Sequence, residues 1–194
     1  MRVIQVGLIS LVSLFLFACS AAPARYDVSN QRVSTSTKIS GSFDALRLGE
    51  FYYSPPGNLG QFDVSNFGCL PCRADGGFSN LRFTTPVKDI VAAEVQSVLN
   101  DFQLANVEKK CSIGGVVNLL GIAISSGEQT LDVTYSMFKN DREIVKQRIL
   151  EKNFDGILSP YGNGRQFERV TQKSIENFLM SKSVSETYKK NCIS

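Results

Sequence analysis

The N-terminal end of the chain determines where the rest of it folds. Met1 and Arg2 are followed by an apolar run from Val3 to Phe17. A basic residue, a hydrophobic segment and a small residue at the cleavage point are typical of a secretory signal peptide. The 15 residues of the run are fewer than the roughly 20 that a membrane-spanning helix needs. We therefore expect residues 1–18 to be a signal peptide and the rest of the chain to fold outside the cytoplasm.

The segment Leu16-Phe17-Ala18-Cys19 resembles the lipobox of bacterial lipoproteins, although Phe17 is bulkier than the residue usual there. The resemblance implies that Cys19 is acylated and becomes the lipidated N-terminus. Several acyl chains attach a protein stably to a bilayer. By the lipoprotein sorting rule, Ser20 in place of Asp directs the protein to the periplasmic face of the outer membrane. The alternative is an ordinary signal peptide followed by a chance cysteine.

Four cysteines remain after Cys19, and an even number in an oxidising compartment predicts two disulfides with three possible pairings. We favour Cys69 with Cys72 and Cys111 with Cys192. A close Cys-x-x-Cys pair can also perform redox chemistry or bind a metal. Here turn-rich residues follow Cys72 instead of a helix, which favours a structural crosslink.

Composition argues against several classes of function. The chain contains no histidine, which removes Ser-His and Cys-His nucleophiles and His-ligated zinc. Loss of Arg2 leaves 20 of the 21 basic residues against 18 acidic ones, so no nucleic-acid-binding charge pattern is visible. We expect a protein that is not an enzyme and that holds no cofactor and no metal.

The mature chain divides into a tether, a domain and a tail. Residues 19–38 are polar and lack periodicity, which predicts a flexible tether with a reach of roughly 25 Å. Residues 39–182 form the expected periplasmic domain, and residues 183–194 a polar tail. Within the domain, residues 54–84 form an insertion longer than ordinary loops. Its aromatic residues predict a satellite core or a partner-binding surface, and the binding candidates are Tyr52, Tyr53, Phe62, Phe67, Phe78 and Phe83.

Apolar spacing predicts the elements of the domain. In chain order they are a strand near 43–53, a helix over 86–102, strands over 113–125, 131–138 and 144–154, and a helix over 165–181. Asn140-Asp141 predicts a tight hairpin turn. Each helix has one apolar stripe that needs a sheet to cover it. The expected fold is therefore an α+β two-layer sandwich, with an antiparallel sheet of about four strands and two helices on one face.

This arrangement resembles the YajG-type lipoproteins. The resemblance rests on the lipobox, the linker, the opening strand Leu46–Phe51, the helix Val87–Phe102, the strand Leu131–Phe138 with its hairpin, and the closing helix. More loosely, it is similar to LptE-like and PqiC-like accessory lipoproteins of envelope transport. The resemblance covers most of residues 43–182, and the insertion with its two cysteines departs from it. It implies an accessory role without catalytic residues.

Three functional hypotheses follow. The first is an outer-membrane lipoprotein whose periplasmic domain binds an envelope protein or assembly through the Tyr52–Phe83 region. The second is binding or shuttling of a lipid or other hydrophobic small molecule, in a groove between sheet and helices lined by Val117, Leu119 and Tyr135. The third is dithiol redox chemistry by Cys69 and Cys72.

Overall fold

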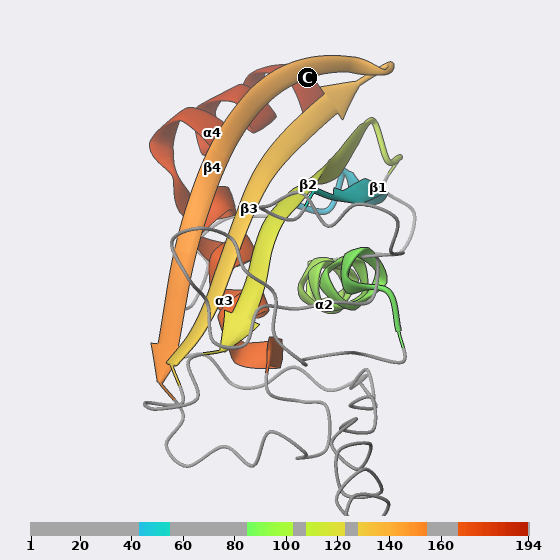
Figure 1. Cartoon of the computed structure of the whole chain (residues 1–194). Helices are drawn as coiled ribbons and strands as arrows, with labels where there is room; N and C mark the ends of the chain where they lie inside the picture. Colours follow the sequence, from blue (N-terminus) through green and yellow to red (C-terminus); the bar gives the residue numbers. More distant parts are fainter. Residues whose placement is uncertain (1–42, 55–84, 103–107, 123–127, 155–166, 194) are drawn as a thin grey trace, which may run out of the picture.

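The computed structural model describes residues 43–54, 85–102, 108–122, 128–154 and 167–193, which form a four-stranded sheet with a layer of helices (Figure 1). In chain order the elements are β1 (Leu46–Tyr53), α2 (Val87–Asn100), β2 (Cys111–Ile122), β3 (Glu128–Lys139), β4 (Arg142–Phe154), α3 (Glu168–Met180), α4 (Lys182–Tyr188) and the π-helical turn η2 (Lys189–Ile193). The predicted α+β class and the order β-α-β-β-β-α are confirmed. The signal peptide, the tether and residues 55–84 of the insertion lie outside the described residues.

The four strands lie side by side in the order of the sequence. β2, β3 and β4 form an antiparallel meander, and Asn140 and Asp141 turn the β3–β4 hairpin with positive φ angles of 48° and 62°. β1, however, pairs with β2 in parallel, with Leu46 beside Cys111. The prediction of a wholly antiparallel sheet is therefore wrong for β1. The reason is that α2 lies between β1 and β2 in the chain, and a helical crossover returns the chain to the end where it started.

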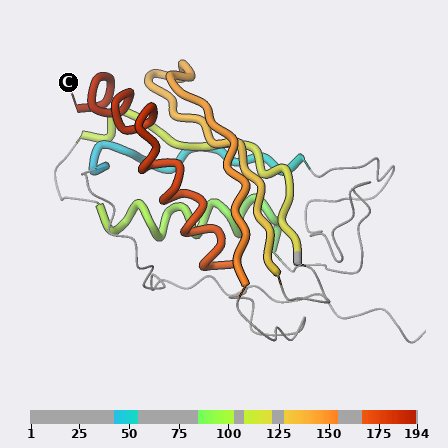
Figure 2. The backbone as a smooth tube through the Cα atoms, turned by 90° about the vertical axis from the view of Figure 1, so that its left-hand side faces the viewer, coloured from blue at the N-terminus to red at the C-terminus, as the bar shows by residue number. Residues whose placement is uncertain are grey.

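The helices cover one face of the sheet. α2 contacts β1 and β2, α3 contacts β3 and β4, and the two helices contact each other, so they form a single layer (Figure 2). Their apolar stripes meet alternate strand residues, and Leu131, Val133 and Met137 of β3 have no exposed surface. Each fully buried side chain of this kind contributes about 1.5–3 kcal/mol relative to its exposed state. The core therefore lies entirely between the helix layer and this face.

Aromatic contacts connect the two layers at the centre of the core. The ring of Tyr135 lies 6.2 Å from that of Phe51 and 5.2 Å from that of Phe178, so one residue of β3 joins β1 to α3. The Tyr135 hydroxyl donates a hydrogen bond to Ser174 Oγ at 3.1 Å. Burial raises the pKa of Tyr135, which keeps the phenol neutral. A buried phenol with a partner fills the core without leaving an unpaired polar group.

The C-terminal segment Lys182–Ile193 is bound to the start of the sheet by a disulfide and by hydrogen bonds, and we call it the C-terminal clasp. A disulfide joins Cys111 of β2 to Cys192 across 81 positions, with the Cα atoms 5.7 Å apart. The Tyr188 hydroxyl accepts a hydrogen bond from the Ala45 N–H at 3.1 Å and donates one to Asp44 Oδ1 at 3.2 Å. The prediction of a polar tail over residues 183–194 missed α4 and η2, because the polar composition hides the two buried residues of α4, Val184 and Tyr188.

We expect the Cys111→Ala/Cys192→Ala variant to lose about 2–5 kcal/mol of unfolding free energy, because the crosslink restricts a long loop of the unfolded chain. Urea denaturation with and without a reducing agent measures the loss. Reduction should destabilise the wild type and leave the variant unchanged. The matched control is Cys69→Ser/Cys72→Ser, which should loosen residues 54–84 to proteolysis while sparing the fold. Equal global destabilisation by both double variants would contradict the assignment.

Tyr188 should make the fold sensitive to alkaline pH. Burial and the neighbouring Asp44 carboxylate raise the pKa of Tyr188 from 10.0 to about 12. The contribution of this phenol to stability is therefore complete below pH 10 and declines as the pH rises toward 12, because only the unfolded phenol ionises in that window. Tyr188→Phe should cost about 1 kcal/mol at neutral pH and should flatten the decline above pH 10. Denaturation series at neutral pH and above pH 10 test this, with the wild type as the reference. An unchanged alkaline slope in Tyr188→Phe would refute it.

Candidate binding face of the sheet

The face of the sheet opposite the helices is the candidate site, and we call it the outer face. In the part of the chain that the structure describes, no helix lies on it (Figure 1). Strand alternation places every second side chain there. Its principal members are Arg47, Glu50 and Tyr52 of β1, Val116 and Asn118 of β2, Asp132, Thr134, Ser136 and Phe138 of β3, and Lys146, Arg148, Leu150, Lys152 and Phe154 of β4.

Large apolar side chains are exposed at opposite edges of this face. Tyr52 of β1 is 58% exposed, and Leu150 and Phe154 of β4 are 59% and 65% exposed. Single exposed apolar residues are ordinary on protein surfaces, whereas a contiguous exposed apolar patch marks a contact surface. The outer face thus combines apolar edges with a polar centre.

A hydrogen-bonded network of three strands occupies that centre. Asp132 of β3 accepts hydrogen bonds from Asn118 Nδ2 of β2 at 3.1 Å and from Arg148 Nε of β4 at 2.9 Å. Asn118 Nδ2 also donates to Thr134 Oγ1 at 3.0 Å. The Asp132 side chain is only 9% exposed, whereas that of Arg148 is 67% exposed. The hydrogen bond and charge of Asp132 raise the pKa of Arg148. The paired hydrogen bonds from Arg148 Nε and Nη2 to Asp132 hold the guanidinium in one orientation, with its outer edge in solvent. A fixed guanidinium can bind a carboxylate or phosphate group through paired hydrogen bonds.

A hollow of about 730 Å³ lies beside this network, toward β1. Tyr52, Val116 and Phe138 supply apolar walls, and Arg47 and Lys146 supply charge. Two of the acidic side chains of the hollow, Glu50 and Glu143, already have partners. The Tyr52 hydroxyl donates to Glu50, which raises the pKa of Tyr52, and Ser136 Oγ donates to Glu143 Oε2 at 2.8 Å, which lowers the pKa of Glu143. The hollow is of the size of a ligand pocket. The carboxylates of Glu50 and Glu143, however, accept hydrogen bonds from other side chains of the sheet.

Two glycines allow the strands to approach closely beneath this region. A Cβ on Gly114 would lie 2.2 Å from the backbone oxygen of Glu50, and one on Gly115 would lie 2.4 Å from that of Thr134. β1 shifts register at this point, between Leu48 and Phe51. Where another backbone approaches a strand this closely, the strand residue is usually glycine, because glycine has no Cβ that would clash. The irregular spacing of apolar residues in Leu46–Tyr53 is therefore a bulge.

The residues predicted as binding candidates divide into two groups. Tyr52 is exposed on the outer face, whereas Tyr53 is partly buried and packs against the core. Phe62, Phe67, Phe78 and Phe83 lie outside the described residues, as do Cys19, Cys69 and Cys72, so their roles stay predictions. The disulfide between Cys111 and Cys192 corresponds to the favoured long-range pair.

The three residues predicted to line a lipid groove do not lie together on one cavity wall. Val117 and Tyr135 have no exposed surface and pack inside the core. Leu119 is partly buried and, after a register shift, pairs with Asp132. Sequence reasoning also missed the Asn118–Asp132–Arg148 network. Alternation indicated that Asp132 faces solvent, but only the strand register brings Arg148 beside it.

Among the described residues, no group of three or more acidic or cysteine side chains is placed to hold a metal ion. None of the described helices combines the length and the apolar character needed to cross a membrane.

Comparison with solved structures shows where the fold recurs. Protein XCC0632 of Xanthomonas campestris, assigned to the DUF330 family, superposes with a TM-score of 0.59 at 8% identity, covering 90% of this chain and 100% of that one. An uncharacterized protein has a TM-score of 0.43 at 8% identity, covering 88% of this chain and 99% of its own. A Caulobacter crescentus protein described provisionally as a lipoprotein has a TM-score of 0.36 at 12% identity, covering 50% of this chain and 80% of its own. The first likeness shows a shared fold, and the other two are too weak to support an argument.

No protein-family model and no curated protein matches the sequence. The YajG-like relationship therefore stays a prediction from the sequence.

The network makes a testable contribution to stability. We expect Asp132→Ala to cost about 1–3 kcal/mol, because Asn118 and Arg148 lose their common acceptor. Arg148→Ala should cost less than about 1 kcal/mol, because its side chain is mostly in solvent. Urea denaturation of the two single variants and the double variant measures both losses and their coupling. Losses of equal size in the two single variants, or strict additivity in the double variant, would argue against the network.

Proposed function

We propose that the protein is a lipid-anchored, non-enzymatic lipoprotein of the bacterial outer membrane, and that its periplasmic domain binds an envelope protein or assembly through the outer face. The anchor is Cys19, preceded by the signal peptide. The helices of the domain cover one face of its sheet, and the other face is exposed to the periplasm.

The observation that carries this proposal is the one-sided burial of the sheet. The helix side contains the core, and the outer face carries exposed Tyr52, Leu150 and Phe154 around the fixed guanidinium of Arg148. Protein interfaces are enriched in aromatic residues and arginine, with polar groups that already have partners. The outer face has that character.

The arrangement of acidic groups supports a role in binding over one in catalysis. A general base needs a carboxylate within reach of the substrate and able to accept a proton. Asp132 is occupied by Asn118 and Arg148, and Glu143 is held ionised by Ser136. These carboxylates stabilise the face and leave Arg148 as the group presented to a partner.

A hydrophobic small molecule is the second candidate, because the 730 Å³ hollow has apolar walls at Tyr52, Val116 and Phe138. This placement differs from the groove expected between sheet and helices. In this case Arg47 and Lys146, which also line the hollow, would bind a charged head group.

Photocrosslinking in intact cells tests the proposal. Probes at Tyr52, Thr134 and Leu150 sample the outer face, and probes at Phe67 and Phe78 sample the insertion. A probe at Lys182, whose side chain is 89% exposed on α4, is the matched control. We expect the outer-face probes to capture one envelope protein and the control to capture none.

A pair of glutamate substitutions then tests the captured contact. Leu150→Glu should reduce crosslinking from Tyr52 at least about tenfold, since a buried apolar contact is replaced by an unpaired charge, while Lys182→Glu should not. Capture of lipid at Tyr52 would favour the second candidate. The same protein captured equally at Lys182 would contradict a specific outer-face interface.

A further inference from the structure

We propose that the end of the sheet where β1 and β2 begin docks on anionic phospholipid head groups of the bilayer that holds the Cys19 anchor, and thereby orients the domain. This inference rests on the proposed lipid anchoring. We call this region the basic end, and its core is formed by Arg47, Lys109, Lys110 and Lys139.

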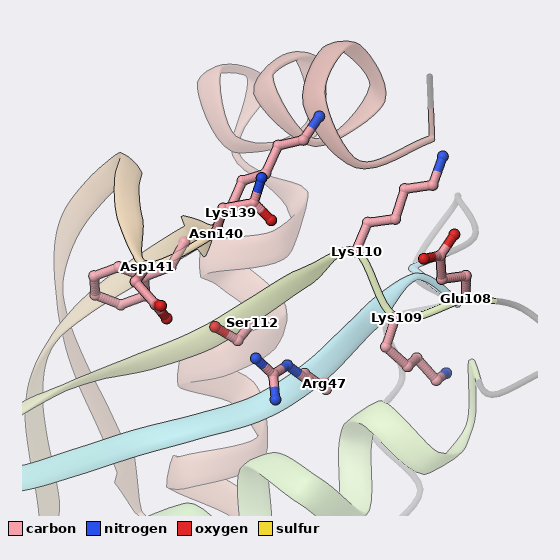
Figure 3. A pocket seen from close by; sticks show the side chains of 9 residues that line it. Arg47, Glu108, Lys109, Lys110, Ser112, Lys139, Asn140 and Asp141 are labelled. Carbon is pink, nitrogen blue, oxygen red and sulfur yellow. The ribbon is translucent and has the colours of Figure 1, made fainter.

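The topology gathers these four side chains from three places in the chain. β1 and β2 are parallel and begin at the same end, whereas β3 finishes there and turns into β4 at Asn140 and Asp141. Arg47 lies near the start of β1, Lys109 and Lys110 precede β2, and Lys139 ends β3 (Figure 3). Together with Glu108, Ser112 and Asp141 they line a pocket of about 540 Å³. The pocket is therefore a product of the parallel pairing.

Positive charge is concentrated at this end. Four basic side chains face two acidic ones in the pocket, while the whole chain has 21 basic and 18 acidic residues. The clasp adds Lys189 and Lys190, because the Cys111–Cys192 disulfide fixes η2 beside the start of β2. Lys139 Nζ donates to the Asn191 carbonyl, which holds the two segments together. Basic residues near a membrane surface are attracted to anionic lipids.

The anchor enters the domain at this same end. Cys19 precedes Phe43 by 24 positions, and Phe43 packs against Tyr188 of the clasp with ring centres 4.7 Å apart. Lys109 Nζ donates to the Asp44 carbonyl, so the segment that enters β1 is bonded to the basic end itself. A short tether raises the local concentration of lipid head groups around the surface from which it leaves. Among the described ends of the sheet, this is the one that the anchor keeps nearest to the bilayer.

The occupant that fits is a phospholipid head group. A phosphate can accept hydrogen bonds from the Arg47 guanidinium and from the lysine ammonium groups. Docking in this way would place the strands roughly upright on the membrane. The outer face would then remain accessible to a partner in the periplasm, which agrees with the proposed function.

The test uses the lipidated mature protein on vesicles of phosphatidylcholine, with and without phosphatidylglycerol. Acetylation of individual lysines, read by mass spectrometry, reports their exposure. We expect Lys109, Lys110 and Lys189 to react at least about threefold more slowly when phosphatidylglycerol is present, and this protection to disappear at high salt. Lys88 and Lys152, which lie at the opposite end of the sheet, should react equally on both vesicles.

Charge reversal gives the matched variants. Arg47→Glu/Lys110→Glu should abolish the protection of Lys109 and Lys189, and Lys88→Glu/Lys152→Glu should retain it. Sedimentation with both kinds of vesicle reports the lipid anchor separately. A protein that sediments but shows no lipid-dependent protection, or protection that resists salt, overturns basic-end docking and leaves the anchor intact. A protein that fails to sediment overturns both proposals.

Discussion

Parallel pairing of β1 with β2 is the constraint on which the rest of the structure depends. It requires α2 to cross over one face of the sheet, and α3 then packs beside α2 on the same face. Among the described elements, no helix covers the opposite face. The same pairing brings the beginnings of both strands to one end, where the basic side chains gather. One topological choice therefore produces both the outer face and the basic end.

The C-terminal clasp stabilises that arrangement at β1. β1 has eight residues, whereas β2 has 12, so β1 by itself adds little pairing to the sheet. The Cys111–Cys192 disulfide and the Tyr188 hydrogen bonds to Asp44 and Ala45 connect the start of β1, the start of β2 and the C-terminal segment. A crosslink that closes a long loop stabilises the folded state by restricting the unfolded chain. Stability and the placement of charge thus depend on the same few contacts.

Most of the fold was predictable because its signals are local. The stripe of α2, the alternation of Leu131–Met137 and the Asn140-Asp141 turn each need only a few neighbouring residues to be recognised. The direction of β1 and the Asp132–Arg148 pair were not predictable, because both depend on register between distant segments. The clasp was missed for a related reason: two buried residues in a polar stretch become a helix only through contacts made elsewhere. Of the predicted binding candidates that the structure describes, Tyr52 lies on the outer face and Tyr53 packs against the core.

The central claim is that the outer face is open in the isolated domain and covered in the cell. Single cysteines at Thr134 and Leu150, labelled with a membrane-permeant maleimide, measure this directly, with Lys182 as the comparison position. The account predicts rapid labelling of all three positions in purified protein, and protection of Thr134 and Leu150 but not of Lys182 in intact cells. Equal labelling of Thr134 and Leu150 in both settings would show that nothing occupies the face and would contradict the account.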